Sequence, residues 1–185
     1  MCQRPVDSRD SSVPSAKGVA VAVQDLSTAA LFARALAEVR DDDPSGRVAH
    51  LVALHERPTR EVFDTAVGLT GSADPQRRQL GVRVLRELGL SRSRYGPLRD
   101  ETIAHLTRLL HRETDLTVLP WVISALGYRS AHQALTDVLC YAGHPDQAVR
   151  FHVAAALPAP LRRLGGLGRH RVVPASRVVR RCSGN

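Results

Sequence analysis

The segment HPDQAVRFHVAAAL at residues 144–157 decides the fold class. It opens with a turn built from proline and aspartate. The residues after the turn place valine, alanine and leucine at helical spacing. We therefore predict that this segment is the second helix of a helical pair.

Two upstream segments have the same plan: SADPQRRQLGVRVLRELG at residues 72–89 and TDLTVLPWVISALG at residues 114–127. The three predicted second helices end at Leu88, Leu126 and Leu157, with spacings of 38 and 31 residues. These spacings are typical of repeated helical pairs. Because a lone pair cannot bury its apolar face, we expect neighbouring pairs to stack on one another.

An amphipathic helix is predicted before each of these segments, at residues 59–72, 98–112 and 130–143. In the first of them, Val62, Phe63, Ala66 and Leu69 share one face and Thr59 is the expected N-cap. Pro120 is expected in the first turn of its helix, where proline is tolerated. Gly89 is expected to end the helix that precedes it.

The segment at residues 144–157 resembles the second-helix signature of HEAT repeats: a turn with Asp and Pro, then Val-Arg, then small and aliphatic residues ending in Ala-Leu. The closest form is the HEAT-like repeat of the phycobilisome-lyase type, which is common in bacterial proteins, and the resemblance covers about residues 47–158. It implies a core position for Val149 and a role for Arg150 in tying neighbouring repeats together. The first repeat instead has Arg77 and Arg78 after its turn, and the second repeat has no arginine there.

The resemblance implies an all-α fold, a short α-solenoid of about three to four antiparallel helix pairs. Composition agrees, since aromatic residues make up only 4% of the 185 residues and the runs that strands favour are sparse. The segment DDDPSG at residues 41–46 is expected to form a solvated turn that caps the next helix, with Asp43 or Ser45 as the cap. The expected organisation is a disordered leader at 1–24, a repeat domain at 25–158 with clear repeats at 59–89, 98–127 and 130–158, and a basic, disordered tail at 159–185.

The tail carries most of the net charge of +8. All 18 acidic residues lie between Asp7 and Asp146, and residues 161–185 hold seven of the 26 lysines and arginines. Two interpretations stay open: a basic interaction segment, or the product of a shifted reading frame that replaced a further repeat. We favour the second, because periodicity and acidic residues end at the same point. Translation of the downstream DNA in the other frames tests it.

No catalytic constellation is recognisable. The chain has no G-x-S-x-G, C-x-x-C or H-E-x-x-H motif. HEAT-like di-iron hydroxylases need several His-Glu pairs, whereas this chain has only His55-Glu56. We therefore expect no metal, no cofactor and no enzymatic activity. The remaining histidines are expected on the surface or in loops: His50, His105, His111, His132, His144, His152 and His170.

Cysteine usage and hydropathy predict a cytoplasmic protein. Cys2, Cys140 and Cys182 are too few for a disulfide framework, and Cys140 is expected to be a buried, inert thiol. No apolar run approaches the length of a membrane span, so no membrane partner is expected.

The leading hypothesis for function is a scaffold or adaptor that binds an unidentified protein. The alternative is a nucleic-acid-binding helical repeat, and a lyase or other enzyme is a weaker hypothesis still. Trp121 is either a partner anchor or, as we favour, part of the core between repeats. The candidate partner-binding residues are Arg78, Arg83, Arg86, Trp121 and Arg150. A phosphate-binding groove would need basic residues on successive repeats, and the second helix of the second repeat has none.

Overall fold

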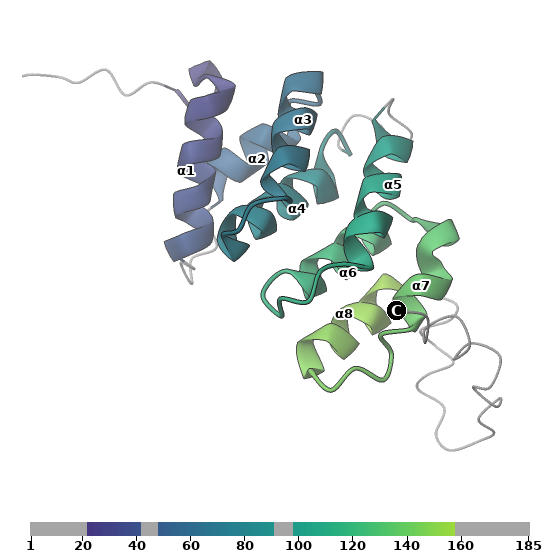
Figure 1. The fold of residues 1–185 in the computed structure, drawn as a ribbon. Coiled ribbons are helices and arrows are strands. Elements are labelled where there is room, and N and C mark those ends of the chain that lie inside the picture. Colours follow the sequence, from purple (N-terminus) through teal and green to yellow (C-terminus); the bar gives the residue numbers. More distant parts are fainter. Residues whose placement is uncertain (1–21, 42–47, 91–97, 158–185) are drawn as a thin grey trace, which may run out of the picture.

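The computed structural model describes residues 22–41, 48–90 and 98–157, and within these ranges all regular structure is helical. Figure 1 labels the α-helices along the chain. Their bounds are α1 Thr28–Asp41, α2 Ala49–His55, α3 Arg60–Leu69, α4 Pro75–Glu87, α5 Arg99–Leu110, α6 Leu119–Tyr128, α7 Leu135–Leu139 and α8 Gln147–Ala156. Two 3-10 turns, η1 Val23–Asp25 and η2 His132–Ala134, complete the set.

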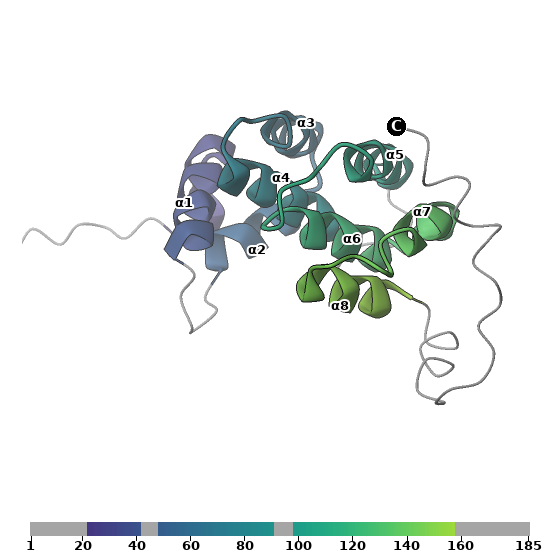
Figure 2. The ribbon, with the colours of Figure 1, turned by 60° about the horizontal axis from the view of Figure 1, so that its bottom comes forward.

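The helices lie in two rows (Figure 2). One row, which we call the even row, consists of α2, α4, α6 and α8. Within it, α2 packs against α4, α4 against α6 and α6 against α8. The second row lies against the even row: α3 packs against α4, and α5 packs against both α6 and α7. Helix α1 contacts both α2 and α4 at the N-terminal end of the described residues. Each helix of the even row between the two ends is therefore covered on three sides.

One hydrophobic cluster runs through all of the helix pairs. Val62, Phe63 and Ala66 of α3 are buried in it, on the face that the helical spacing predicts. Leu69, the fourth residue of that expected face, is half-buried. Stacking of successive pairs therefore supplies the apolar burial that no single pair could provide.

Several predicted helix boundaries are confirmed. The Thr59 hydroxyl accepts a hydrogen bond from the Val62 amide at 3.3 Å, and Pro120 lies in the first turn of α6. Gly89 follows the end of α4 with φ of 72°, a conformation that favours glycine. Its amide donates to the His55 carbonyl at 2.8 Å, so this stop also ties α4 to α2.

A glycine allows α6 and α8 to approach each other closely. A Cβ added at Gly127 would lie only 2.7 Å from the Ala156 Cα atom. The two backbones therefore meet without an intervening side chain at this point, which favours a small residue on both helices.

The third pair and the leader differ from expectation. Residues 130–143 form η2 and the short α7 instead of one continuous helix, because the amides of Cys140, Tyr141 and Ala142 bond three residues back. The expected leader extends too far: Val23 packs against the core, and the Gln24 carbonyl accepts a hydrogen bond from Arg57. The candidate caps Asp43 and Ser45 and the tail at 159–185 lie outside the described residues.

Candidate functional site

Arginine and aromatic side chains gather on the even row, between α4 and α6. The Arg86 Cζ atom lies 3.6 Å from the centroid of the Tyr128 ring and 5.5 Å from that of Trp121. The Arg83 Cζ atom lies 4.8 Å from the centroid of the Trp121 ring. We call these four residues the arginine–aromatic cluster. Each such contact contributes roughly 0.5–1 kcal/mol where it is exposed.

Helix geometry places the four side chains together. Arg83 and Arg86 are three residues apart in α4, so they share one face of that helix. Trp121 and Tyr128 are seven residues apart in α6, which is close to two helical turns. The packing of α4 against α6 then brings the two faces to a common surface.

Helix α8 extends this surface. The ring centroids of Trp121 and His152 are 6.1 Å apart, and Phe151 meets His152 edge to face with centroids 5.5 Å apart. Tyr128 is 52% exposed and Phe151 is 66% exposed, whereas Trp121 is half-buried. Trp121 therefore both packs against the core and forms the floor of an exposed aromatic surface.

The charge of the cluster comes from its arginines. An Arg86 guanidinium nitrogen lies 3.5 Å from the Glu87 carboxylate, and Arg86 Nε is the one buried side-chain polar atom of the described residues without a hydrogen-bond partner. Burial, with a smaller contribution from Arg86, lowers the pKa of His152 below 6.5. Both effects favour the neutral form of His152, so the positive charge of the cluster lies on the arginines over aromatic rings.

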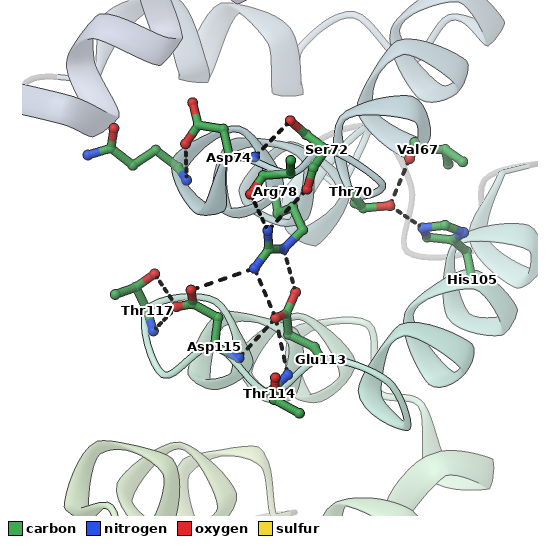
Figure 3. A network of polar contacts seen from close by, with 12 residues as sticks. Val67, Thr70, Ser72, Asp74, Arg78, His105, Glu113, Thr114, Asp115 and Thr117 are labelled. Carbon is green, nitrogen blue, oxygen red and sulfur yellow. Dashed lines mark hydrogen bonds and ion pairs between the residues drawn. The ribbon is translucent and has the colours of Figure 1, made fainter.

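Arg78 has a different environment from Arg83 and Arg86 (Figure 3). Its Nε donates to Glu113 at 2.8 Å and a terminal nitrogen donates to the same carboxylate at 3.2 Å. The other terminal nitrogen donates to the carbonyls of Ser72 and Ala73 at 3.0 and 3.1 Å. Arg78 thus joins the turn before α4 to the turn before α6, and it is engaged within the chain.

Arg150 occupies the matching place in α8. It lies four residues after the N-cap Asp146, as Arg78 lies four residues after the N-cap Asp74. One of its nitrogens donates to the carbonyls of His144 and Pro145 at 2.8 and 2.6 Å. The five candidate partner-binding residues therefore fall into two groups. Arg83, Arg86 and Trp121 belong to one cluster. Arg78 and Arg150 instead bind the carbonyls of the turns that precede their helices.

Sequence reasoning missed three residues that matter here. Tyr128 could have been found from its spacing of seven residues from Trp121. Glu113 and Arg129 had no such signal, because each lies just beyond a helix and is buried by a neighbouring pair, with 8% and 5% exposure. Only the tertiary contacts of these two residues reveal their roles.

Three of the histidines expected on the surface or in loops lie within helices and are half-buried. His50 is half-buried and its Nδ1 lies 2.6 Å from a Glu38 oxygen, and His105 Nε2 lies 2.8 Å from the Thr70 hydroxyl. His152 is the third, as described above. Helix stacking covers these rings in part, and their sequence context gave no sign of it.

The His55-Glu56 pair shows no metal-binding geometry. His55 Nε2 lies 3.0 Å from the Arg83 carbonyl oxygen. Groups of three or more His, Cys, Asp or Glu side chains that could hold a metal ion are not found among the described residues. Cys140 is half-buried, so the expectation of a fully buried thiol is wrong.

No protein-family model matches the chain, and no match to a curated protein or to a solved structure was found. Across the described ranges, no helix combines the length and the apolar character needed to cross a membrane.

The free energy of unfolding is expected to decrease as the pH falls below about 6.5. Burial lowers the pKa of His55, His105 and His152, so the unfolded chain binds protons more tightly than the folded protein does. The stabilisation is complete above the unfolded pKa and is lost as the pH falls toward the folded values. Urea titrations at about pH 8 and about pH 5.5 measure this loss, and both lie above the range in which carboxylates titrate.

The variant His55→Gln removes one of these groups, and we expect a smaller loss between the two pH values than in the original chain. Equal stability at both pH values in the original chain would contradict the prediction.

Proposed function

We propose that this chain is a non-catalytic protein-binding module, a cytoplasmic scaffold or adaptor whose helix pairs form a short HEAT-like solenoid. The order of packing in the even row supports the solenoid, because α2, α4, α6 and α8 contact one another in chain order. Arg78 supports the resemblance to HEAT repeats, since it ties the turns of two neighbouring pairs together.

The arginine–aromatic cluster is the proposed partner-binding surface, and its exposed Tyr128 over Arg86 is the observation that carries the proposal. Tryptophan, tyrosine and arginine dominate the binding energy of protein interfaces. Stacking of Arg86 on two rings also holds its long side chain in place before a partner arrives, which reduces the entropy lost on binding.

A protein partner fits this surface better than nucleic acid does. In the even row the exposed cations are not repeated from pair to pair, since α6 has no arginine or lysine within its bounds. A phosphate backbone would require cations at regular intervals along the row.

Tyr128→Ala is expected to weaken binding of the partner at least tenfold, or by about 1.4 kcal/mol. The partner is first captured from a lysate of the source cells with the tagged full-length chain, and its affinity is then measured with purified components. Leu116→Ala is the matched control, because Leu116 is a large apolar residue of similar exposure (50%) outside the cluster.

A partner that binds both variants as tightly as the original chain would contradict the proposal. DNA and RNA oligomers titrated across a salt series, with and without residues 161–185, address the alternative function. A steep salt dependence that persists without the tail would replace the protein-binding proposal with nucleic-acid binding.

A further inference from the structure

Helix α8 is the last helix of the even row within the described residues, and the face that it turns away from α6 is exposed. Phe151 is 66% exposed, the largest exposed fraction among the large hydrophobic side chains of the described residues. Arg150 and Ala154 are exposed beside it. Residues three and four positions apart lie on one side of a helix, so these three residues form a single face. We call it the α8 end face.

The equivalent positions of α4 are buried or half-buried. Counting from the N-cap aspartates, Val82 of α4 corresponds to Ala154 of α8, and Arg78 corresponds to Arg150. Val82 has 0% exposure, and Arg78 on the same side of α4 reaches the turn that leads into α6. The α8 end face is therefore the equivalent of the surface on which α4 receives the next helix.

Charge defines what the α8 end face would receive. Arg78 pairs with two carboxylates of the incoming turn, Glu113 at 2.8 Å and Asp115 at 3.6 Å. Arg150 makes the same two carbonyl contacts to its own turn that Arg78 makes. Within the described ranges, however, Arg150 has no carboxylate partner. Compared with α4, the α8 end face therefore lacks an acidic turn followed by an apolar helix.

We propose that the α8 end face docks an amphipathic helix of a protein partner, and that the turn preceding this helix carries a carboxylate that pairs with Arg150. The carboxylate would take the place that Glu113 takes at Arg78, and the apolar side of the helix would cover Phe151 and Ala154. This face shares no residue with the arginine–aromatic cluster, which it adjoins through the contacts of His152 with Phe151 and Trp121.

The chain itself is a poorer source of such a helix. Residues 158–185 contain no aspartate or glutamate, so they offer Arg150 no acidic side chain. In a second copy, the acidic turns before α4 and α6 are already engaged: Arg40 pairs with Asp74 at 2.8 Å, and Arg78 pairs with Glu113.

A synthetic peptide with the sequence of residues 111–129 is a suitable probe, because it contains the acidic turn and the helix that α4 receives. Its affinity for the full-length chain is measured by fluorescence anisotropy. A matched peptide carries Glu113→Gln and Asp115→Asn. We expect the acidic peptide to bind at least tenfold more tightly than the amide peptide, and Phe151→Ser in the chain to weaken its binding at least tenfold.

Arg150→Gln is expected to remove the difference between the two peptides, whereas Arg108→Gln, at an exposed position of α5, is expected to preserve it. Tyr128→Ala is expected to leave peptide binding unchanged, which separates this test from that of the proposed function. Circular dichroism checks that the variants are folded.

Equal binding of the two peptides, or peptide binding that Phe151→Ser does not weaken, would overturn the proposal. Sedimentation velocity of the chain alone addresses the second copy as an occupant. Self-association that Phe151→Ser abolishes would assign the α8 end face to another copy and would likewise overturn the proposal.

Discussion

Arg129→Ala is expected to lower the free energy of unfolding by about 3 kcal/mol. Arg129 is only 5% exposed, and its guanidinium donates to the Leu85 carbonyl at 2.9 and 2.6 Å and to the Leu88 carbonyl at 2.9 Å. These are carbonyls at the C-terminal end of α4, which have no partner within their own helix. Removal of the side chain leaves them buried and unsatisfied, and it also leaves a cavity between α4 and α6.

Burial lowers the pKa of Arg129 to about 10, so the side chain remains charged at neutral pH and its hydrogen bonds are charge-assisted. Urea denaturation of the full-length chain measures the effect. Arg129→Lys keeps the charge but has one nitrogen in place of three, and an intermediate stability is expected. Arg108→Ala, an exposed arginine in α5, is the control and is expected to change stability by less than about 0.5 kcal/mol. A similar small effect of Arg129→Ala would contradict the assigned role.

Arg78→Ala is expected to lower the free energy of unfolding by about 2–3 kcal/mol. The substitution leaves the Glu113 carboxylate, whose side chain is 5% exposed, without its cationic partner. It also removes the bonds that hold the carbonyls of Ser72 and Ala73. The ion pair that joins the turn before α4 to the turn before α6 would then be lost.

A double-mutant cycle with Glu113→Gln isolates the ion pair, and a coupling energy of about 1 kcal/mol or more is expected. Arg77→Ala is the matched control, because Arg77 is the adjacent residue, its side chain is 54% exposed and it lies 3.8 Å from Asp74. Additive effects of Arg78→Ala and Glu113→Gln would show that the pair does not couple the two turns.

Much of the fold could be predicted from local patterns. Apolar spacing placed the buried face of α3, Thr59 and Pro120 marked helix starts, and Gly89 marked a stop. Each of these signals acts within a few residues, so the sequence displays it directly. The length of α7 was overestimated, since apolar periodicity over residues 130–143 does not distinguish an α-helix from a run of tighter turns.

The candidate site was predictable only in part. The sequence offered Arg78, Arg83 and Arg86 together as candidate partner-binding residues of one helix, but it could not separate their roles. The separation depends on where α6 and its preceding turn lie: Glu113 reaches Arg78, whereas Trp121 and Tyr128 reach Arg83 and Arg86. These contacts join residues about 35 or more positions apart, and no local pattern encodes them.

The sequence by itself determined that this chain forms helical pairs, because spacing, caps and turns are short-range properties of the backbone and its nearest side chains. The tertiary structure alone decided what each helix face does. Val82 of α4 is fully buried, whereas Phe151 of α8 is exposed. The physical reason is that burial and pairing of a side chain depend on what the neighbouring pair brings to it, and successive helices of this even row bring different groups.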